Sequence, residues 1–244
     1  MPHSKVYAGP WGRTRFMKQL MHRVMDRLGI EINRSTTLRR FFGEHHIDLV
    51  IDAGANLGQF AQLVRNKGYH GRIWSFEPVP SVFTALHSAA RNIPNWEVSQ
   101  FALGNADGML TINVPSNHSL SSFLKPSELL ASYDTVGGLI TESVEVKRLD
   151  KVLHDDQAKQ IFLKADVQGF EKQVLDGSTG ILDRVHAIYI ELPIAHLYEG
   201  GWTFGEAISY LDGIGFTPAQ FRSVNSMMND RASAVEFDCL FRRK

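Results

Sequence analysis

The sequence predicts an α/β fold: a doubly wound, mostly parallel sheet that follows an N-terminal helical extension. Short apolar runs alternate with segments in which apolar residues recur at helical spacing. This alternation is typical of parallel strands joined by right-handed helical crossovers. The first apolar run also ends in a glycine turn followed by a helix, which is the ligand-binding corner of such folds. For a chain of 244 residues, we expect one domain over residues 47–244 and an extension over residues 1–46.

The extension contains a predicted amphipathic helix at residues 13–28. Phe16, Leu20, Val24 and Leu28 recur at helical spacing, and Arg and Lys side chains flank this apolar stripe. We interpret it as a helix that packs on the main domain. A basic amphipathic helix also fits an anionic membrane surface or a homodimer contact, and both remain alternatives.

The elements of the main domain follow in order from residue 47. Parallel strands are predicted at residues 48–53, 72–76, 96–102, 161–167 and 187–192, because each is a short apolar run that ends near turn residues. Helices are predicted at residues 59–67, 80–91, 171–175 and 204–214. Residues 216–221 and 234–241 complete the sheet. Residues 108–114 and 143–149 alternate apolar with polar side chains and predict an added antiparallel pair, with a polar loop at residues 115–138 between them.

Composition argues against several classes of protein. The chain has 26 basic and 26 acidic residues, so its formal net charge is zero, and we expect no nucleic-acid partner. The single Cys239 allows no internal disulfide, and its apolar neighbours indicate a buried thiol. The sequence has neither an apolar run long enough to cross a membrane nor the apolar segment of a signal peptide. We therefore expect a cytoplasmic protein.

The glycine turn after the first strand indicates which ligand this corner takes. Gly54 and Gly58 do not match the G-x-G-x-x-G spacing of a dinucleotide site, and Asp52 would repel a pyrophosphate but suits a cation. The second strand is followed by Glu77, whose carboxylate can accept hydrogen bonds from a ribose diol. A nucleoside with a cationic tail and no phosphate satisfies both ends, so the sequence predicts S-adenosylmethionine as the cofactor.

We expect the cofactor to touch the ends of the strands and the first helix. The predicted contacts are Asp52, Gly54, Ala55, Asn56, Gly58, Phe60, Glu77, Pro78, Phe101, Ala102, Leu103 and Asp166. Residues 101–103 would flank the adenine. The alternatives are a generic strand-to-helix turn capped by Asp52, a surface acid at Glu77, and plain core packing at residues 101–103.

Asp166 is the first candidate for the catalytic group. It ends the fourth strand at the same sheet edge as Asp52, so it should lie near the methyl group, where it could deprotonate a substrate hydroxyl, bind a metal or orient the substrate. Glu191 at the end of the fifth strand is a second carboxylate, and His118 and His196 are the histidines placed to reach the crevice. A helix cap at Asp166 and solvated loop histidines are the alternatives. Since the sequence has no metal-ligand spacing, we expect no metal.

The polar loop and the segment after the fifth strand could bind an acceptor. Hydroxyl and amide side chains of the loop could hydrogen-bond a polyhydroxylated molecule, and two aromatic residues could stack on a sugar face. These residues are Asn117, Ser119, Ser121, Ser122, Tyr198 and Trp202. Solubility alone would also produce a Ser-rich loop, so both interpretations stand.

Five motifs in order make the chain resemble the FkbM family of S-adenosylmethionine-dependent methyltransferases. They span residues 51–58, 76–80, 102–104, 164–171 and 197–201, and the resemblance covers residue 47 to the C-terminus. Asp-Val-Gln-Gly-Phe-Glu at residues 166–171 is the most specific block, and Ala165 stands where the family usually has Ile. The resemblance implies a class I methyltransferase-like (Rossmann-like) fold and O-methylation.

Within the family, the chain looks closest to the branch that methylates deoxysugar hydroxyls of glycolipids and glycans. The expected acceptor is therefore a small molecule or glycan. A polyketide or other natural-product hydroxyl is the alternative, because the same fold serves many acceptors. A nicotinamide-dependent oxidoreductase is disfavoured by the missing third glycine and by Asp52. A non-catalytic nucleoside-binding module is the remaining alternative.

Overall fold

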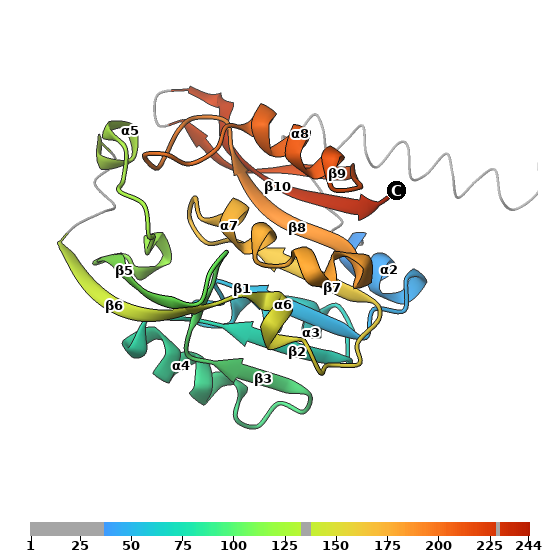
Figure 1. The fold of residues 1–244 in the computed structure, drawn as a ribbon. Coiled ribbons are helices and arrows are strands. Elements are labelled where there is room, and N and C mark those ends of the chain that lie inside the picture. The colour runs from blue at the N-terminus through green and yellow to red at the C-terminus, as the bar shows by residue number, and fades with distance from the viewer. Residues whose placement is uncertain (1–36, 133–137, 228–229) are drawn as a thin grey trace, which may run out of the picture. The chain divides into compact units, whose positions relative to one another are not determined.

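The computed structural model describes residues 37–132, 138–227 and 230–244 (Figure 1). The helix expected at residues 13–28 lies outside this range. Within the described part, one seven-stranded sheet has the order β3-β2-β1-β7-β8-β10-β9. Its strands are β1 (Leu49–Ala53), β2 (Arg72–Phe76), β3 (Trp96–Ser99), β7 (Ile161–Ala165), β8 (Val185–Pro193), β9 (Phe216–Met227) and β10 (Asp230–Arg243). The five strands from β3 to β8 are parallel, and β10 runs antiparallel to both β8 and β9, so the α/β doubly wound prediction is confirmed.

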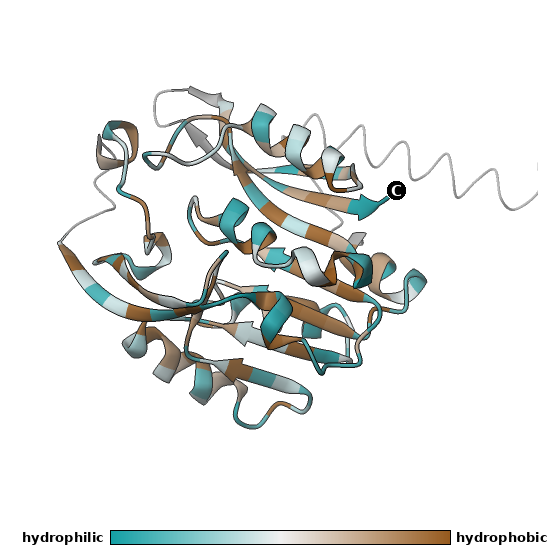
Figure 2. Ribbon diagram, viewed as in Figure 1, coloured by the Kyte–Doolittle hydropathy of each residue, from teal (hydrophilic) through white to brown (hydrophobic). Residues whose placement is uncertain are grey.

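Helices cover both faces of this sheet, as strands with continuous apolar runs require. The helices are α2 (Thr37–Glu44), α3 (Gln59–Asn66), α4 (Pro80–Ala90), α6 (Leu149–Val152), α7 (Glu171–Asp176) and α8 (Phe204–Gly213). Alternate residues of each strand point to opposite faces. Leu49 and Ile51 therefore pack with α6, α7 and α8, whereas Val50 packs with α2, α3 and α4. Figure 2 shows the apolar residues concentrated along the central strands.

A smaller sheet packs beside the N-terminal end of α4. It consists of β4 (Ala102–Leu103), β5 (Gly108–Pro115) and β6 (Leu139–Lys147) in the order β4-β6-β5. The predicted antiparallel pair is confirmed by the register of β5 on β6. Its buried side chains Ile112, Val114 and Val144 pack on Val79 and Val82, which fixes the small sheet against the main domain.

The third strand differs from the prediction of one strand at residues 96–102. Pairing with β2 ends at Ser99, and Ala102 pairs instead with Val146 of the small sheet. Phe101 lies at the bend, with its ring centroid 5.2 Å from that of Phe76. One apolar run thus supplies two sheets, because the chain turns between them.

The remaining described elements are short or lie within the expected extension. They are α2, the 3₁₀ helices η1 (His118–Leu120) and η2 (Thr179–Arg184), and α5 (Glu128–Ser132). Leu38, Phe41 and Phe42 of α2 are buried in the same apolar cluster as Phe162 of β7. No helix in the described ranges combines the length and apolar character needed to cross a bilayer.

Candidate functional site

The turn after β1 packs directly against the residue that follows β7. Gly54 has φ +69°, and a Cβ added there would lie 2.0 Å from the carbonyl oxygen of Asp166. Only glycine fits this contact, since both the left-handed backbone and the lack of space exclude a side chain. Gly58 has φ +85°, and a Cβ there would lie 2.6 Å from the Trp96 ring. Gly58 therefore allows close packing of α3 on β3.

Asp52 is fully buried and forms an ion pair behind the turn. Ser75 Oγ donates a hydrogen bond to Asp52 Oδ2 over 3.0 Å, and Lys164 Nζ lies 3.1 Å from Oδ1. The carboxylate that was expected to meet the cofactor's cationic tail is thus already neutralised by a lysine of the protein. This corrects the prediction for Asp52: it supports the turn from beneath.

Lys164 connects the turn to the catalytic candidate. Its ammonium donates to the carbonyl oxygens of Ala53 and Gly54 over 3.1 and 2.9 Å, and it lies 3.6 Å from Asp166 Oδ2. Burial works to lower the pKa of Lys164, but Asp52 and Asp166 outweigh it and raise that pKa above its ordinary value. Sequence reasoning missed this residue. The available signal was a lysine inside the otherwise apolar strand at residues 161–165, because a charge in such a strand needs a buried partner.

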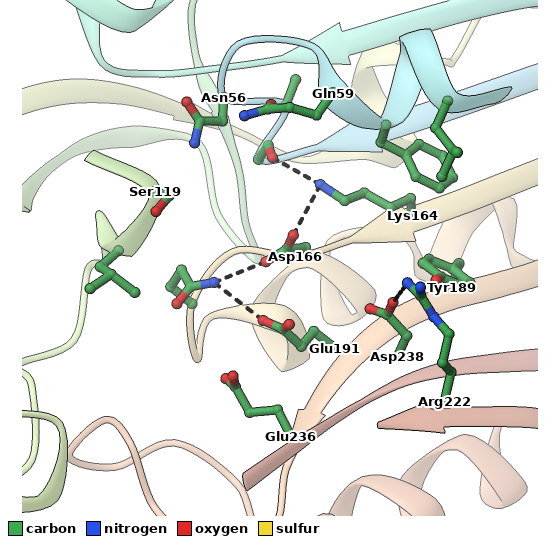
Figure 3. A pocket seen from close by; sticks show the side chains of 16 residues that line it. Asn56, Gln59, Ser119, Lys164, Asp166, Tyr189, Glu191, Arg222, Glu236 and Asp238 are labelled. Atoms are coloured by element: carbon green, nitrogen blue, oxygen red, sulfur yellow. Dashed lines mark hydrogen bonds and ion pairs between the residues drawn. The ribbon is translucent and has the colours of Figure 1, made fainter. Parts of the chain in front are cut away.

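Two cavities open at the carboxyl ends of the parallel strands. The larger, about 440 Å³, is lined by Gly54, Ala55, Asn56, Gln59, Phe60, Leu63, Ser119, Leu120, Lys164, Asp166, Gln168, Tyr189, Glu191, Arg222, Glu236 and Asp238 (Figure 3). The smaller, about 50 Å³, is lined by Gly54, Asn56, Glu77, Pro78, Ala102, Leu103, Ile112, His118, Ser119, Ser121, Phe123, Asp166, Val167 and Gln168. Gly54, Asn56, Ser119, Asp166 and Gln168 line both. Asp166 is the titratable residue among these shared ones, so it stands where the two cavities meet.

The smaller cavity collects most of the residues predicted to touch the nucleoside. Glu77 is buried there, and its carboxylate accepts backbone hydrogen bonds from Asn56 and Val79, both over 2.9 Å. Burial raises the pKa of Glu77 to about 7. Ala55 and Phe60 line only the larger cavity, and Phe101 lines neither, because its ring packs on Phe76 under the ammonium of Lys147.

Gln168 holds the two predicted carboxylates in place. Its backbone is left-handed at φ +54°, and its amide donates to Asp166 Oδ1 over 3.0 Å and to Glu191 Oε2 over 3.4 Å. The amide oxygen accepts from the Tyr198 hydroxyl over 2.7 Å. Tyr198 is buried in an apolar cluster with Leu130 and Leu197, and Trp202 is buried in the main core. This corrects the expectation that their rings would stack on a sugar.

The two candidate histidines end up in different places. His118 is exposed and lines the smaller cavity. His196 is exposed and lies outside both cavities, in a segment whose backbone carbonyl accepts a hydrogen bond from Ser127 over 2.7 Å. This corrects the prediction for His196, since the chain turns away from the sheet edge after β8. Of the loop hydroxyls, Ser119 and Ser121 face the cavities, whereas Ser122 is buried and bonded to the backbone.

Glu171 is a buried acid beneath the loop between β7 and α7. Its Oε1 accepts backbone hydrogen bonds from Val167 and Gly169 over 3.1 and 3.0 Å, which fixes the turn that carries Gln168. Its Oε2 is buried without a hydrogen-bond partner among the described residues. Burial accordingly raises the pKa of Glu171 to about 7.

We expect the stability of the protein to fall as the pH rises from about 4.5 to 7. Glu77 and Glu171 lose their protons near pH 4.5 in the unfolded chain but only near pH 7 when folded. In this window the folded state holds protons that the unfolded state has released, so each group lowers the unfolding free energy by up to about 1.4 kcal/mol per pH unit. Chemical denaturation across this range measures the slope.

Glu171→Gln should flatten that slope, whereas Glu128→Gln, an exposed acid on α5, should leave it unchanged. An identical slope in wild type and Glu171→Gln would show that Glu171 ionises normally in the folded protein.

Acids of β8 and β10 complete the larger cavity. Asp238 stands opposite Glu191 in the strand register, and Glu236 lies two residues before Asp238 in β10, on the same face. Burial, followed by the charges of Asp166, Glu236 and Asp238, raises the pKa of Glu191 well above its ordinary value. Arg222 of β9 pairs with Asp238. Glu191 was predicted; the other three were not, although the alternating Glu-Phe-Asp at residues 236–238 indicated a strand with one polar face.

Comparison with known proteins identifies the family. The pattern of the methyltransferase FkbM domain matches residues 52–218. The chain belongs to the FkbM methyltransferase family. It is therefore an S-adenosylmethionine-dependent methyltransferase, as predicted.

The FkbM relatives are distant. "Methyltransferase 1" of Beauveria bassiana is 28% identical over 70% of this chain and 72% of its own length. The "31-O-demethyl-FK506 methyltransferase FkbM" of Streptomyces tacrolimicus is 28% identical over 70% and 73%. The "Hexuronic acid methyltransferase AglP" of Haloferax volcanii is 25% identical over 59% and 56%.

The smaller cavity of this FkbM methyltransferase has the chemistry that the cofactor's nucleoside requires. Ala102, Leu103 and Phe123 supply apolar surface, and Glu77 supplies a carboxylate at the end of β2. Asn56 Oδ1 is a buried acceptor without a partner among the described residues, at the junction of the cavities. The residues present therefore fit the cofactor, although a cavity of about 50 Å³ must widen to admit it.

Glu77→Ala in this FkbM methyltransferase should weaken cofactor binding about tenfold to a hundredfold, because a lost charge-assisted hydrogen-bond pair costs about 1.5–3 kcal/mol. Calorimetric titration with S-adenosylmethionine measures the change, and circular dichroism checks that the fold survives. Glu77→Gln, which keeps an acceptor for the backbone N–H groups, separates the lost charge from a loosened turn. An unchanged dissociation constant in both variants would reduce Glu77 to a structural acid.

Proposed function

We propose that the protein methylates a hydroxyl group on a sugar residue of a glycolipid or glycan, with Asp166 directing that hydroxyl. The observation that carries this proposal is the position of Asp166 where the two cavities meet. A methyl group that passes from a donor in one cavity to an acceptor in the other must pass this junction. The Asp166 side chain is 39% exposed, so it is accessible from the cavities while Lys164 holds it from behind.

The bound cofactor supplies an electrophilic methyl group. Glu77 and Asn56 would hold its nucleoside end. Asp166 would accept the proton of the acceptor hydroxyl as the oxygen gains the methyl group. Gln168 holds Asp166 Oδ1 and Lys164 lies near Oδ2, so the carboxylate has a fixed orientation before the acceptor arrives.

The polarity of the larger cavity supports a hydroxyl-rich acceptor. Asp166, Glu191, Glu236 and Asp238 offer carboxyl oxygens that can accept hydrogen bonds from several hydroxyl groups. A relative named for methylation of a hexuronic acid supports a sugar acceptor. A hydroxyl of a polyketide-type natural product is the second candidate, supported by the relative named for 31-O-demethyl-FK506.

Turnover with mixed acceptors tests the proposal. The protein is incubated with S-adenosylmethionine carrying an isotopically labelled methyl group and either a glycolipid and glycan extract or a polyketide extract. We expect a sugar-containing product heavier by one labelled methyl group, and no such product with Asp166→Asn at the same protein concentration and time. Labelling of polyketides alone would select the second candidate.

We expect turnover to survive exhaustive chelation. Within the described residues, the His, Cys, Asp and Glu side chains form no group of three or more that could hold a metal ion. Initial rates are compared before and after dialysis against EDTA, with the cofactor in excess. Loss of turnover that Mg²⁺ or Mn²⁺ restores would recast Asp166 and Glu191 as metal ligands.

A further inference from the structure

The lining of the larger cavity combines apolar rings with carboxyl groups. Phe60 and Leu63 of α3 belong to it, together with the Tyr189 ring, which stacks on Phe60 with centroids 5.6 Å apart and planes 26° apart. Glu191, two residues after Tyr189 on the same face of β8, and Glu236 of β10 add carboxyl groups to the same lining. A ring-shaped molecule with one apolar face and hydroxyl groups at its rim matches both kinds of lining side chain.

The cations of the cavity are already engaged. Among the described residues that line it, the positive charges are Lys164 and Arg222. Lys164 lies between Asp52 and Asp166. Figure 3 shows its contact with Asp166 and the pair that Arg222 forms with Asp238. Neither is thus available to neutralise an acid group on an acceptor without losing a carboxylate partner.

The cavity also disfavours additional negative charge. Its lining has two cations and four carboxyl groups, and the carboxyl groups are those of Asp166, Glu191, Glu236 and Asp238. Burial, and then the three neighbouring acids, raise the pKa of Glu191, so Glu191 holds its proton more readily and the opposing negative charge comes from Asp166, Glu236 and Asp238. An acceptor carboxylate placed beside them would meet like charge, which is costly at a desolvated contact.

We propose that the larger cavity binds an uncharged sugar ring, with its apolar face on Phe60 and its hydroxyl groups toward Glu191 and Glu236, and rejects the corresponding uronic acid. This deepens the proposed function and rests on it for the assignment of the larger cavity to the acceptor. The proposed acceptor specificity differs from that of the relative that is named for a hexuronic acid.

Binding of matched sugar pairs tests the proposal. The probes are the methyl glycosides of glucose, galactose and mannose and of their three uronic acids, titrated into protein saturated with S-adenosylhomocysteine and followed by ligand-observed NMR. We expect the neutral member of at least one pair to bind about tenfold or more tightly than its uronate. Equal or tighter uronate binding in every pair, or no neutral ligand bound, would overturn the proposal.

The Asp238→Asn variant gives a sharper test, because it releases Arg222 from its partner. Uronate binding should then strengthen about tenfold, while binding of the neutral sugar changes little. Glu236→Gln should act in the same direction without freeing a cation, and Glu128→Gln, an exposed acid outside both cavities, is the matched control. Unchanged selectivity in both Asp238→Asn and Glu236→Gln would contradict the proposed electrostatic filter.

Turnover on the same ligands separates the two proposals. A neutral sugar that binds selectively but gains no methyl group would leave the inference about the cavity standing and count against sugar O-methylation. Preferred methylation of a uronate over its neutral partner would contradict the inference about the cavity but support sugar O-methylation.

Discussion

Asp166→Asn is expected to lower kcat by roughly 10²–10⁴ while cofactor affinity stays near that of the wild type. The substitution keeps the size of the side chain and its hydrogen bond with Gln168, but it removes the negative charge that receives the acceptor proton. Asp166 stands at the junction of the two cavities, whereas Glu77, which we propose to hold the nucleoside, lines only the smaller one. The effect should therefore fall on chemistry rather than on cofactor binding.

The measurement combines calorimetry with S-adenosylmethionine and turnover at saturating acceptor on one preparation. Glu77→Ala is the matched comparison, because it should show the opposite pattern of weak binding with a smaller loss of kcat. Near-normal kcat in Asp166→Asn would reduce Asp166 to a structural residue. His118 or Glu191 would then become the candidate base, since both line a cavity.

Lys164→Met should destabilise the fold by about 3–5 kcal/mol, the cost of leaving one member of a buried ion pair without its partner. Lys164 is 5% exposed and Asp52 is fully buried, so water cannot replace the lost contact. The variant also removes two hydrogen bonds to the turn at Ala53 and Gly54. Urea denaturation gives the change in unfolding free energy from the shift in midpoint.

Two further variants separate the ion pair from general effects of losing a lysine. Lys172→Met removes the exposed pair with Asp176, 2.7 Å away, and should cost less than about 1 kcal/mol. Combining Lys164→Met with Asp52→Leu removes both buried charges and should recover much of the stability. A double variant as unstable as the sum of its single variants would show that the two residues are not coupled.

The sequence predicts the central strands and the glycine turn after the first strand well, because both depend on local pattern. Buried parallel strands are continuous apolar runs, and the residues that follow them meet at one sheet edge. Glu77 and Asp166 were therefore placed at this edge from sequence. Asp52 was placed there too, but the partner that turns it inward, Lys164, lies 112 residues away, and local pattern contains no information on that pairing.

The residues that sequence analysis missed or misplaced lie where packing decides. Tyr198 and Trp202 are aromatic residues in a loop, a context in which exposure is the natural expectation, yet tertiary contacts bury both. Arg222, Glu236 and Asp238 enter the cavity only because the C-terminal strands β9 and β10 run antiparallel beside β8. Their contribution follows from sheet order, and the sequence predicted that these strands complete the sheet but not what they face.

Ser122 and Tyr198 both hydrogen-bond to Gln168, the residue that orients Asp166. Ser122 Oγ donates to the Gln168 carbonyl over 2.6 Å, and the Tyr198 hydroxyl contacts both Gln168 Oε1 and the Leu120 carbonyl. Because the smaller cavity is only about 50 Å³, we expect these bonds to open when a nucleoside enters or leaves. The hydrogen bonds of Gln168 that orient Asp166 would then also slow the release of the spent cofactor. Weaker bonds to Gln168 would release the spent cofactor faster but align the Asp166 carboxylate less well. Turnover should therefore slow in viscous solvent if the opening of these bonds limits the rate.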